Sequence, residues 1–327
     1  MTSRLRLGVF GAGSIGCYVG GRVLAADAAD VVLVGRPRLR DQLLADGLTV
    51  QDFDGPRATV PAARLTVATS AEALAACDVV LCCVKSQHTA DAARALAGAL
   101  RPDAVVVSLQ NGVRNPDVLR AALPGRRVLA SIVSWNVIAV EGGYRRATSG
   151  PLVIETAPPA LVAALRAGGI PVEERADLAP EQWTKLLVNL NNAVSALSDA
   201  STATLLLSPG YRKVIAALVR EGLDVVRAAG VRPAKWNGVP LALMPRVLRL
   251  PTALVRVITR AQLKVDPAAR SSMWQDLDAR RPTEVDYLNG EIVRVAATCG
   301  RTAPLNRRIV ELIRAAEAAG VGSPRLD

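Results

Sequence analysis

The sequence predicts an α/β protein in which a doubly wound, mostly parallel sheet comes first and an all-helical domain follows. Three observations predict this class. Short β-branched runs alternate with alanine-rich stretches in the first half, a glycine-rich loop follows the first run, and long helical stretches begin near Pro180. Such alternation is typical of βαβ units. Because 327 residues are more than one ordinary core holds, we expect two domains, residues 1–176 and 177–327.

The elements of the first domain follow from the apolar runs. Strands are expected at Leu5–Phe10, Val31–Val34, Leu65–Val67, Val79–Val84 and Ala104–Leu109, with helices at Ser14–Ala26 and near 37–46, 70–76 and 88–100. Short runs separated by Gly pairs and Pro between Val128 and Glu155 indicate an antiparallel extension of the sheet.

The second domain reads as a series of helices. We expect one long helix over Glu181–Leu207, and further helices over Tyr211–Ala229, Val285–Thr298 and Ile309–Ala319. The stretch 231–270 contains several prolines, which is compatible with irregular structure or with short helices.

Composition excludes several functional classes. The formal charge of +11 could suit a polyanion, but the basic residues are scattered, aromatics make up only 3%, and no nucleic-acid-binding motif is present. No apolar run reaches the roughly 18 residues that span a bilayer. We therefore expect neither a nucleic-acid partner nor a membrane, and read the charge as a general arginine-rich composition compatible with a small anionic ligand.

Cysteine and histidine usage narrows the chemistry. The five Cys are an odd number with no C-x-x-C spacing, which indicates free thiols and a cytoplasmic location. His88 is the only histidine, so we expect no metal site and no Ser-His-Asp triad.

A glycine-rich loop identifies the first domain as Rossmann-like. Its residues are Gly11, Ala12, Gly13, Ser14, Ile15 and Gly16. They form G-x-G-x-x-G between a predicted strand and a predicted helix, the context in which the motif binds a dinucleotide. The helix N-terminus then presents backbone N–H groups to the pyrophosphate.

The residue at the end of the second predicted strand indicates whether the chain binds NAD or NADP. NAD-binding units usually carry an acidic residue there for the ribose 2′-hydroxyl, whereas this chain has Arg36, followed by Arg38 and Arg40. Because a guanidinium suits a 2′-phosphate, we predict NADP(H), with Arg36 as its ligand. The alternative is that these arginines only decorate a surface helix.

A polar stripe marks the first helix of the second domain. Lys185, Asn189 and Asn192 stand at i, i+4 and i+7, which places them on one face of a continuous helix. Leucines surround the stripe, which favours a cleft over open solvent. Lys is rare in this chain, with five among 40 basic residues. Unlike Arg, Lys can lose its proton near neutral pH when its pKa is lowered.

The chain resembles the ketopantoate reductase family along nearly its whole length, least between about 198 and 268. The resemblance is carried by the glycine loop, Val84-Lys85-Ser86-Gln87, Gln110-Asn111-Gly112-Val113, Lys185-Leu-Leu-Val-Asn189, and the stretch from Arg270-Ser-Ser-Met-Trp-Gln-Asp to Thr283-Glu-Val-Asp-Tyr-Leu-Asn-Gly290. It implies NADPH-dependent reduction of 2-dehydropantoate to (R)-pantoate, on the route to pantothenate and coenzyme A.

The resemblance also implies residue roles. Lys185 matches the catalytic lysine and Glu284 the family's functional glutamate, which we place at both the catalytic and the cofactor site. Ser272 and Asn189 match substrate-binding residues, and Asn192 is a further candidate. Lys85 and Asn111 match residues near the nicotinamide, and Lys85 is also a candidate substrate ligand. A ketone that accepts hydride gains negative charge on its oxygen, which Lys185 could neutralise or protonate.

Each role has a structural alternative. Ser272 with Gln275 is also a capping box, Thr283 could cap a helix that Glu284 begins, and Lys85 could be a surface cation. The family's second asparagine, four residues after the first, is replaced here by Ala193. This departure leaves open which 2-oxo acid is reduced, but not the redox chemistry, so one alternative is a paralogous reductase that acts on another 2-oxo acid. The alternative from another class is a non-catalytic NADP-binding sensor. The sequence leaves open whether the chain forms a homodimer.

Overall fold

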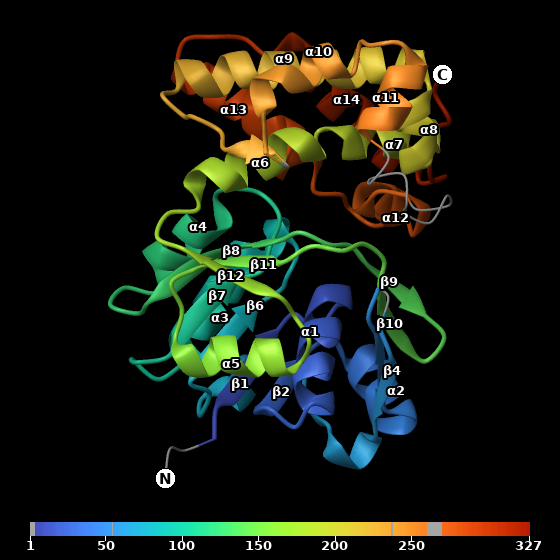
Figure 1. The fold of residues 1–327 in the computed structure, drawn as a ribbon. Coiled ribbons are helices and arrows are strands. Elements are labelled where there is room, and N and C mark those ends of the chain that lie inside the picture. Colours follow the sequence, from blue (N-terminus) through green and yellow to red (C-terminus); the bar gives the residue numbers. More distant parts are fainter. Residues whose placement is uncertain (1–3, 54, 237, 260–269) are drawn as a thin grey trace. The chain divides into compact units, whose positions relative to one another are not determined.

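The computed structural model describes residues 4–53, 55–236, 238–259 and 270–327. The chain divides into two compact units, Met1–Leu178 and Ala179–Asp327, and Figure 1 labels the α-helices and many of the strands. The sequence placed the division two residues earlier, between 176 and 177.

The first unit is built on an eight-stranded sheet with the order β12-β11-β8-β7-β6-β1-β2-β5. Neighbouring strands run parallel except β8 and β11, which are antiparallel. The strands are β1 Arg6–Phe10, β2 Asp30–Val34, β5 Thr66–Ala68, β6 Val79–Cys82, β7 Val105–Ser108, β8 Val128–Val133, β11 Leu152–Glu155 and β12 Val172–Arg175.

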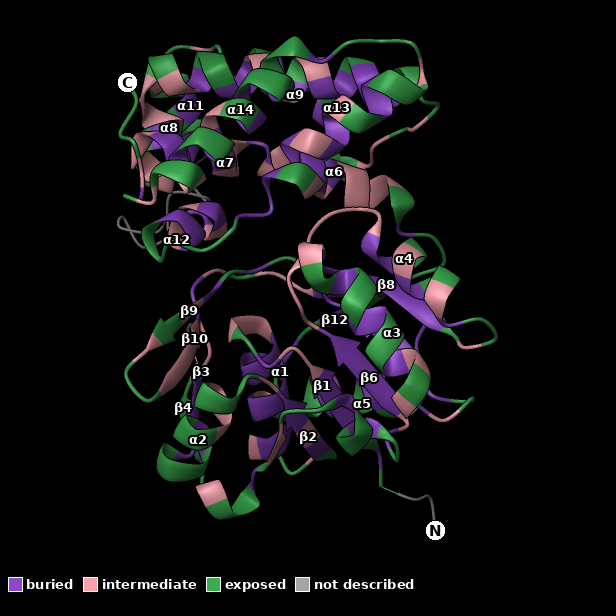
Figure 2. Cartoon of the chain, turned by 180° about the vertical axis from the view of Figure 1, so that it is seen from behind, coloured by how far each residue is buried: buried purple, intermediate pink, exposed green. Residues whose placement is uncertain are grey.

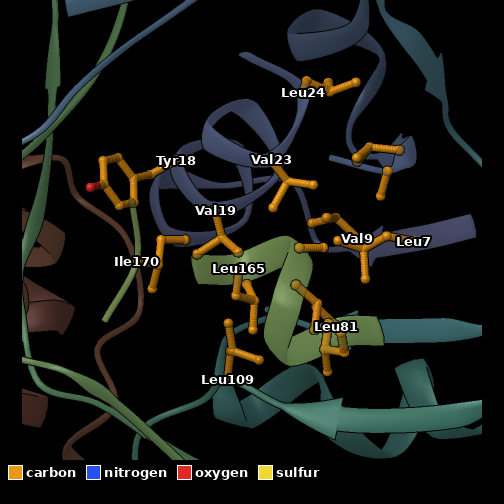
Figure 3. Packing of buried hydrophobic residues seen from close by; sticks show 14 of the residues in the cluster. Leu7, Val9, Tyr18, Val19, Val23, Leu24, Leu81, Leu109, Leu165 and Ile170 are labelled. Carbon is orange, nitrogen blue, oxygen red and sulfur yellow. The ribbon is translucent and has the colours of Figure 1, made fainter. Parts of the chain in front are cut away.

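Helices pack on both faces of this sheet, as the doubly wound prediction requires. Leu81 of β6 belongs to the core with α1 (Ser14–Ala25) and α5 (Pro159–Ala167), whereas the adjacent Val80 packs with α3 (Thr89–Ala99) and α4 (Asn115–Ala122). Figure 2 shows the strands buried between these layers. Figure 3 shows Val23 of α1 pointing toward Val9 of β1. Successive side chains of a strand point to opposite faces, so β6 is apolar throughout.

A second sheet was not predicted. It has the order β4-β3-β10-β9 and consists of β3 Leu48–Gln51, β4 Arg57–Val60, β9 Val137–Val140 and β10 Gly143–Arg146. The expected antiparallel extension is correct for β11 and wrong for β9 and β10. A Cβ on Gly143 would lie 1.8 Å from the Thr49 carbonyl oxygen, so glycine permits this pairing. The expected helix at 70–76 is only a 3₁₀ turn, η2 (Ala71–Leu74), whereas α2 occupies Pro37–Asp46.

In the residues that the structure describes, the second unit is helical apart from a short hairpin of β13 and β14. Its elements are α6 Ala179–Asn189, α7 Asn191–Ser198, α8 Thr202–Leu207, α9 Pro209–Ala228, β13 Lys235–Trp236, β14 Val239–Pro240, η4 Leu241–Leu243, α10 Met244–Val247, α11 Thr252–Ile258, α12 Ser272–Asp278, η6 Val285–Tyr287, α13 Asn289–Thr298 and α14 Pro304–Ala319. The part of 231–270 between 260 and 269 lies outside the described residues.

The prediction of one long helix over Glu181–Leu207 is wrong, because three helices occupy this stretch. The Asn191 side chain donates to the Val188 carbonyl at 2.8 Å, a local bond that competes with continuation of the helix. Asp199 then ends α7 in the left-handed region, with φ 59°. The expected helix over Val285–Thr298 is likewise interrupted, at Leu288.

A buried arginine joins α9 to the segments on either side of it. Arg212 is 2% exposed and donates to the carbonyls of Leu206, Leu207, Leu248 and Leu250 and to the Thr252 hydroxyl. Carbonyl and hydroxyl oxygens thus satisfy the donors of the buried Arg212 guanidinium, with no carboxylate among these partners. These bonds fix the segment from Leu248 to Thr252 to α9, within the stretch that the sequence left undecided.

No helix in the described part of the chain is both long and apolar enough to cross a membrane. All five cysteines are free thiols. Across the same residues, no cluster of three or more His, Cys, Asp or Glu side chains could hold a metal ion.

Candidate functional site

The glycine loop lies between β1 and α1, and two of its glycines are fixed by close packing. Gly11 has φ +91°, and a Cβ there would lie 2.7 Å from the Val84 backbone nitrogen. A Cβ on Gly16 would lie 2.7 Å from Val9 of β1, so this glycine lets the helix approach the strand. The loop is therefore a tight turn pressed against the ends of β1 and β6.

Gly13 differs from its neighbours, because a Cβ there would meet no atom within 4 Å. It is the N-cap of α1, and no side chain caps this helix. The loop thus combines open space with an uncapped helix N-terminus, the arrangement that receives a pyrophosphate. Ala12, Ser14 and Ile15 complete the loop, and the residues present fit a dinucleotide.

Arg36 follows β2 and is the N-cap of α2. The turn lies against the glycine loop, since a Cβ on Gly35 would lie 3.2 Å from the Ala12 Cβ. Arg36 is exposed and has no carboxylate partner among the described residues, whereas Arg40 pairs with Asp41 at 2.7 Å. Arg36 therefore lies in the turn next to the glycine loop, and its assignment to a 2′-phosphate stays a prediction.

Lys85 and Asn111 follow neighbouring strands, β6 and β7, and both are half-buried. A buried polar network joins their turns. Ser86 donates to the Asn111 carbonyl at 3.1 Å, and Asn115 donates to the Ser86 hydroxyl at 3.0 Å. Because the carboxyl ends of adjacent parallel strands share one edge of a sheet, Lys85 and Asn111 lie at the same edge as the glycine loop.

Sequence reasoning missed the side chains that build this network. Gln110 donates to the Val84 carbonyl at 3.0 Å and to the Thr89 hydroxyl at 2.7 Å, and Thr89 bonds Asn115 at 2.9 Å. The visible signal was the pair Gln110-Asn111, polar residues directly after an apolar strand. Their partners in α3 and α4 could not be assigned from the sequence.

In the second unit, Lys185 lies in α6 and is half-buried. Burial lowers the pKa of Lys185 to about 8, and the carboxylate of Glu284 acts in the opposite direction. Desolvation disfavours the charged form of an amine, and a nearby anion favours it. The outcome is an ammonium that can lose its proton close to neutral pH.

Glu284 is 6% exposed and precedes the short 3₁₀ helix η6. Its neighbour Thr283 is fixed on both sides, because its backbone N–H donates to Glu317 at 2.7 Å and its hydroxyl accepts from the Val285 N–H at 3.2 Å. The alternative in which Thr283 caps a helix that Glu284 begins is wrong, because Glu284 is itself the N-cap of η6 and no side chain caps this helix. Glu284 lies close enough to influence the pKa of Lys185.

The two asparagines of the predicted stripe belong to different helices. Asn189 ends α6, whereas Asn192 lies in α7. The prediction that Lys185, Asn189 and Asn192 share one face of a single helix is therefore wrong for Asn192, because the helix breaks at Leu190. Both asparagines are half-buried, and Ala193 is fully buried.

Ser272 is the first residue of α12, and the N-cap of this helix is the preceding residue, Ser271. The Ser271 hydroxyl accepts from the Trp274 N–H at 3.1 Å and donates to the Asn192 carbonyl at 2.9 Å. The alternative in which Ser272 caps the helix is therefore wrong. The cap leaves the Ser272 hydroxyl available, and Ser271 fixes α12 to α7 directly beside Asn192.

Comparison with known families accounts for both units. Residues 7–159 match the family model described as Ketopantoate reductase PanE/ApbA, and residues 177–317 match its C-terminal counterpart. The 2-dehydropantoate 2-reductase of Halobacterium salinarum is 32% identical, over 97% of this chain and 100% of its own. That of Mycobacterium tuberculosis H37Rv is 29% identical, over 95% of this chain and 97% of its own.

Solved structures give the same family. A PanE/ApbA family ketopantoate reductase from Ralstonia eutropha JMP134 superposes with a TM-score of 0.82 at 33% identity, covering 97% of this chain and 99% of that one. D-mandelate dehydrogenase with NADH and anilino(oxo)acetate has a TM-score of 0.80 at 18% identity, with the same coverage, and is similar in fold alone. On these similarities, which span both units, the chain belongs to the ketopantoate reductase family.

Proposed function

We propose that this family member reduces 2-dehydropantoate to (R)-pantoate with NADPH. The observation that carries the proposal is Lys185, a desolvated lysine with a pKa of about 8 beside the buried carboxylate of Glu284. A lysine of this kind can both attract and protonate a developing alkoxide. When NADPH is bound, its nicotinamide supplies the hydride that the ketone carbon accepts.

We assign proton donation and substrate binding to residues of the second unit. Lys185 donates its proton to the ketone oxygen, and Glu284 keeps that lysine protonated at neutral pH by raising its pKa. Ser272 hydrogen-bonds the substrate carboxylate, and Asn189 and Asn192 hold its hydroxyl groups. Fixing these groups before reaction reduces the entropy lost on reaching the transition state. The residues of the glycine loop, Lys85 and Asn111 hold the cofactor.

The function is tested directly by NADPH oxidation against a panel of 2-oxo acids that includes 2-dehydropantoate. We expect 2-dehydropantoate to have the highest kcat/KM. A different best substrate would favour a paralogous reductase, a reading supported by Ala193, which is fully buried where the family commonly has an asparagine. No turnover of any 2-oxo acid would favour the NADP-binding sensor and contradict the proposal.

The proposed choice of NADPH over NADH makes Arg36 a test residue. Arg36→Ala should weaken NADPH binding about 10- to 100-fold, the effect of losing hydrogen bonds to a charged group, and leave NADH binding unchanged. Fluorescence titration of both cofactors measures this. Arg40→Ala is the matched control, because Arg40 already pairs with Asp41. Equal losses for NADPH and NADH in Arg36→Ala would contradict the assignment.

The proposed contact between Ser272 and the substrate is tested by comparing Ser272→Ala with Ser271→Ala. Ser272→Ala should raise the KM for the 2-oxo acid about tenfold, as expected for one hydrogen bond to a carboxylate, with NADPH affinity and melting temperature unchanged. Ser271→Ala should instead lower stability by about 1 kcal/mol, because it removes a helix cap. A loss of cofactor affinity in Ser272→Ala, with unchanged KM, would refute the role.

Two further properties belong to the proposal. The five free thiols support a reducing compartment, which is the cytoplasm. A homodimer is supported by a ketopantoate reductase from Staphylococcus aureus that is described as dimeric and has a TM-score of 0.70 at 18% identity. Sedimentation of the full chain measures the oligomeric state.

A further inference from the structure

Asp199 joins α7 to α12 and was not singled out in the sequence. Its Oδ1 accepts from the Arg270 guanidinium at 3.0 Å and from the Trp274 indole N–H at 2.8 Å. The Arg270 guanidinium also lies over the Trp274 ring, 4.9 Å from its centroid. One carboxylate oxygen therefore holds two side chains, one before and one inside the first turn of α12.

The backbone at Asp199 is adapted to this contact. Asp199 ends α7 with φ 59°, a left-handed conformation that Asp and Asn adopt more readily than most residues. The side chain is about one-quarter exposed, whereas Arg325, which lies 3.5 Å from the other oxygen, is 79% exposed. The contacts with Arg270 and Trp274 are thus the shielded ones, and shielded charge-assisted bonds are the stronger.

A second set of bonds fixes the same junction. The Ser195 hydroxyl donates to the Ala200 carbonyl at 2.8 Å, which closes the turn around Asp199, and the Ser271 hydroxyl donates to the Asn192 carbonyl. Ser272, the proposed carboxylate ligand, lies between Ser271 and Trp274 in the sequence. Hydrogen bonds of Ser271 and of Trp274 therefore fix the position of Ser272, and the bond from Trp274 is accepted by the charged carboxylate of Asp199.

We propose that Asp199 is a positioning residue for the substrate subsite: through Arg270 and Trp274 it fixes the first turn of α12, and so fixes Ser272 relative to Asn192. The inference rests on the proposed function, since it assigns Asp199 a role in binding the same 2-oxo acid. Asp199 itself touches neither substrate nor cofactor. It acts on substrate affinity and not on proton transfer.

The test compares Asp199→Asn with Asp199→Gly. Both residues accept a left-handed backbone, so neither introduces strain. Asparagine keeps one oxygen for Trp274 and loses the charge, whereas glycine removes both contacts. We expect the KM for the 2-oxo acid to rise about threefold in Asp199→Asn and about tenfold in Asp199→Gly, with kcat within about twofold of wild type. NADPH affinity should not change.

The matched control is Asp278→Asn, which removes a carboxylate from the exposed far end of the same helix and should leave all these constants unchanged. Hydrogen exchange over 272–278 gives a readout independent of turnover, and should be faster in Asp199→Gly. Unchanged KM in Asp199→Gly would overturn the inference, as would parallel losses of kcat, NADPH affinity and melting temperature, which mark a general structural defect. A wild-type enzyme that turns over no 2-oxo acid would instead overturn the proposed function, and this inference with it.

Discussion

Lys185→Ala is expected to lower kcat about a thousandfold, within the range contributed by a general acid, while NADPH binding stays nearly unchanged. The reason is that the alkoxide formed by hydride transfer loses both its counter-charge and its proton donor. Steady-state kinetics with 2-dehydropantoate and a fluorescence titration of NADPH measure the two quantities. A variant that retains more than about a tenth of wild-type kcat would refute the assigned role of Lys185.

The pH profile gives the same hypothesis a second test. Because burial lowers the pKa of Lys185 to about 8, and because reduction requires the protonated amine, kcat/KM should fall as the pH rises through about 8. Removing the Glu284 charge in Glu284→Gln should lower the pKa of Lys185 further, since that carboxylate raises it, and should move the fall to lower pH. Lys185→Arg should lose this alkaline limb, because a guanidinium stays protonated. A profile identical in wild type and Glu284→Gln would contradict the coupling.

Gly13→Val is expected to weaken NADPH binding about a hundredfold or more and to leave the melting temperature unchanged. A Cβ at Gly13 would meet no protein atom within 4 Å, and the backbone at Gly13 is extended, with φ −94° and ψ −158°, which valine adopts readily. We therefore expect valine to occupy the open space beside the α1 N-terminus without distorting the protein. That space is where a pyrophosphate would accept backbone hydrogen bonds.

The matched variant is Gly11→Val, in the same loop. Gly11 has φ +91°, and its Cβ would lie 2.7 Å from a backbone nitrogen, so valine there is both strained and overpacked. We expect a loss of about 3 kcal/mol or more in the free energy of unfolding, measured by denaturant titration. If Gly13→Val unfolded the protein as Gly11→Val does, or bound NADPH normally, the proposed cofactor loop would be wrong.

The candidate site was predictable in part. The residues that could be predicted stand in local sequence patterns, whereas those that were missed have partners far away in the sequence. The glycine loop, Arg36 and Lys185 stand in local patterns, a strand-loop-helix motif and a polar stripe among leucines. The network of Ser86, Thr89 and Asn115 was missed, since its members are scattered polar residues whose partners lie in other elements. Asp199 was missed for the same reason.

Local sequence patterns were enough to predict the order of the βαβ units, the cofactor loop and the helical character of the second unit, because hydrophobic periodicity and glycine stereochemistry act over a few residues. Long-range contacts were needed to explain the role of Asp199 at the end of α7, whose carboxylate binds Arg270 and Trp274, and the pairing of β3 with β10. The tertiary structure also decided the pKa of Lys185, since neither the burial of that amine nor the approach of Glu284 is encoded near Lys185 in the chain. Desolvation and long-range charge depend on the packed fold.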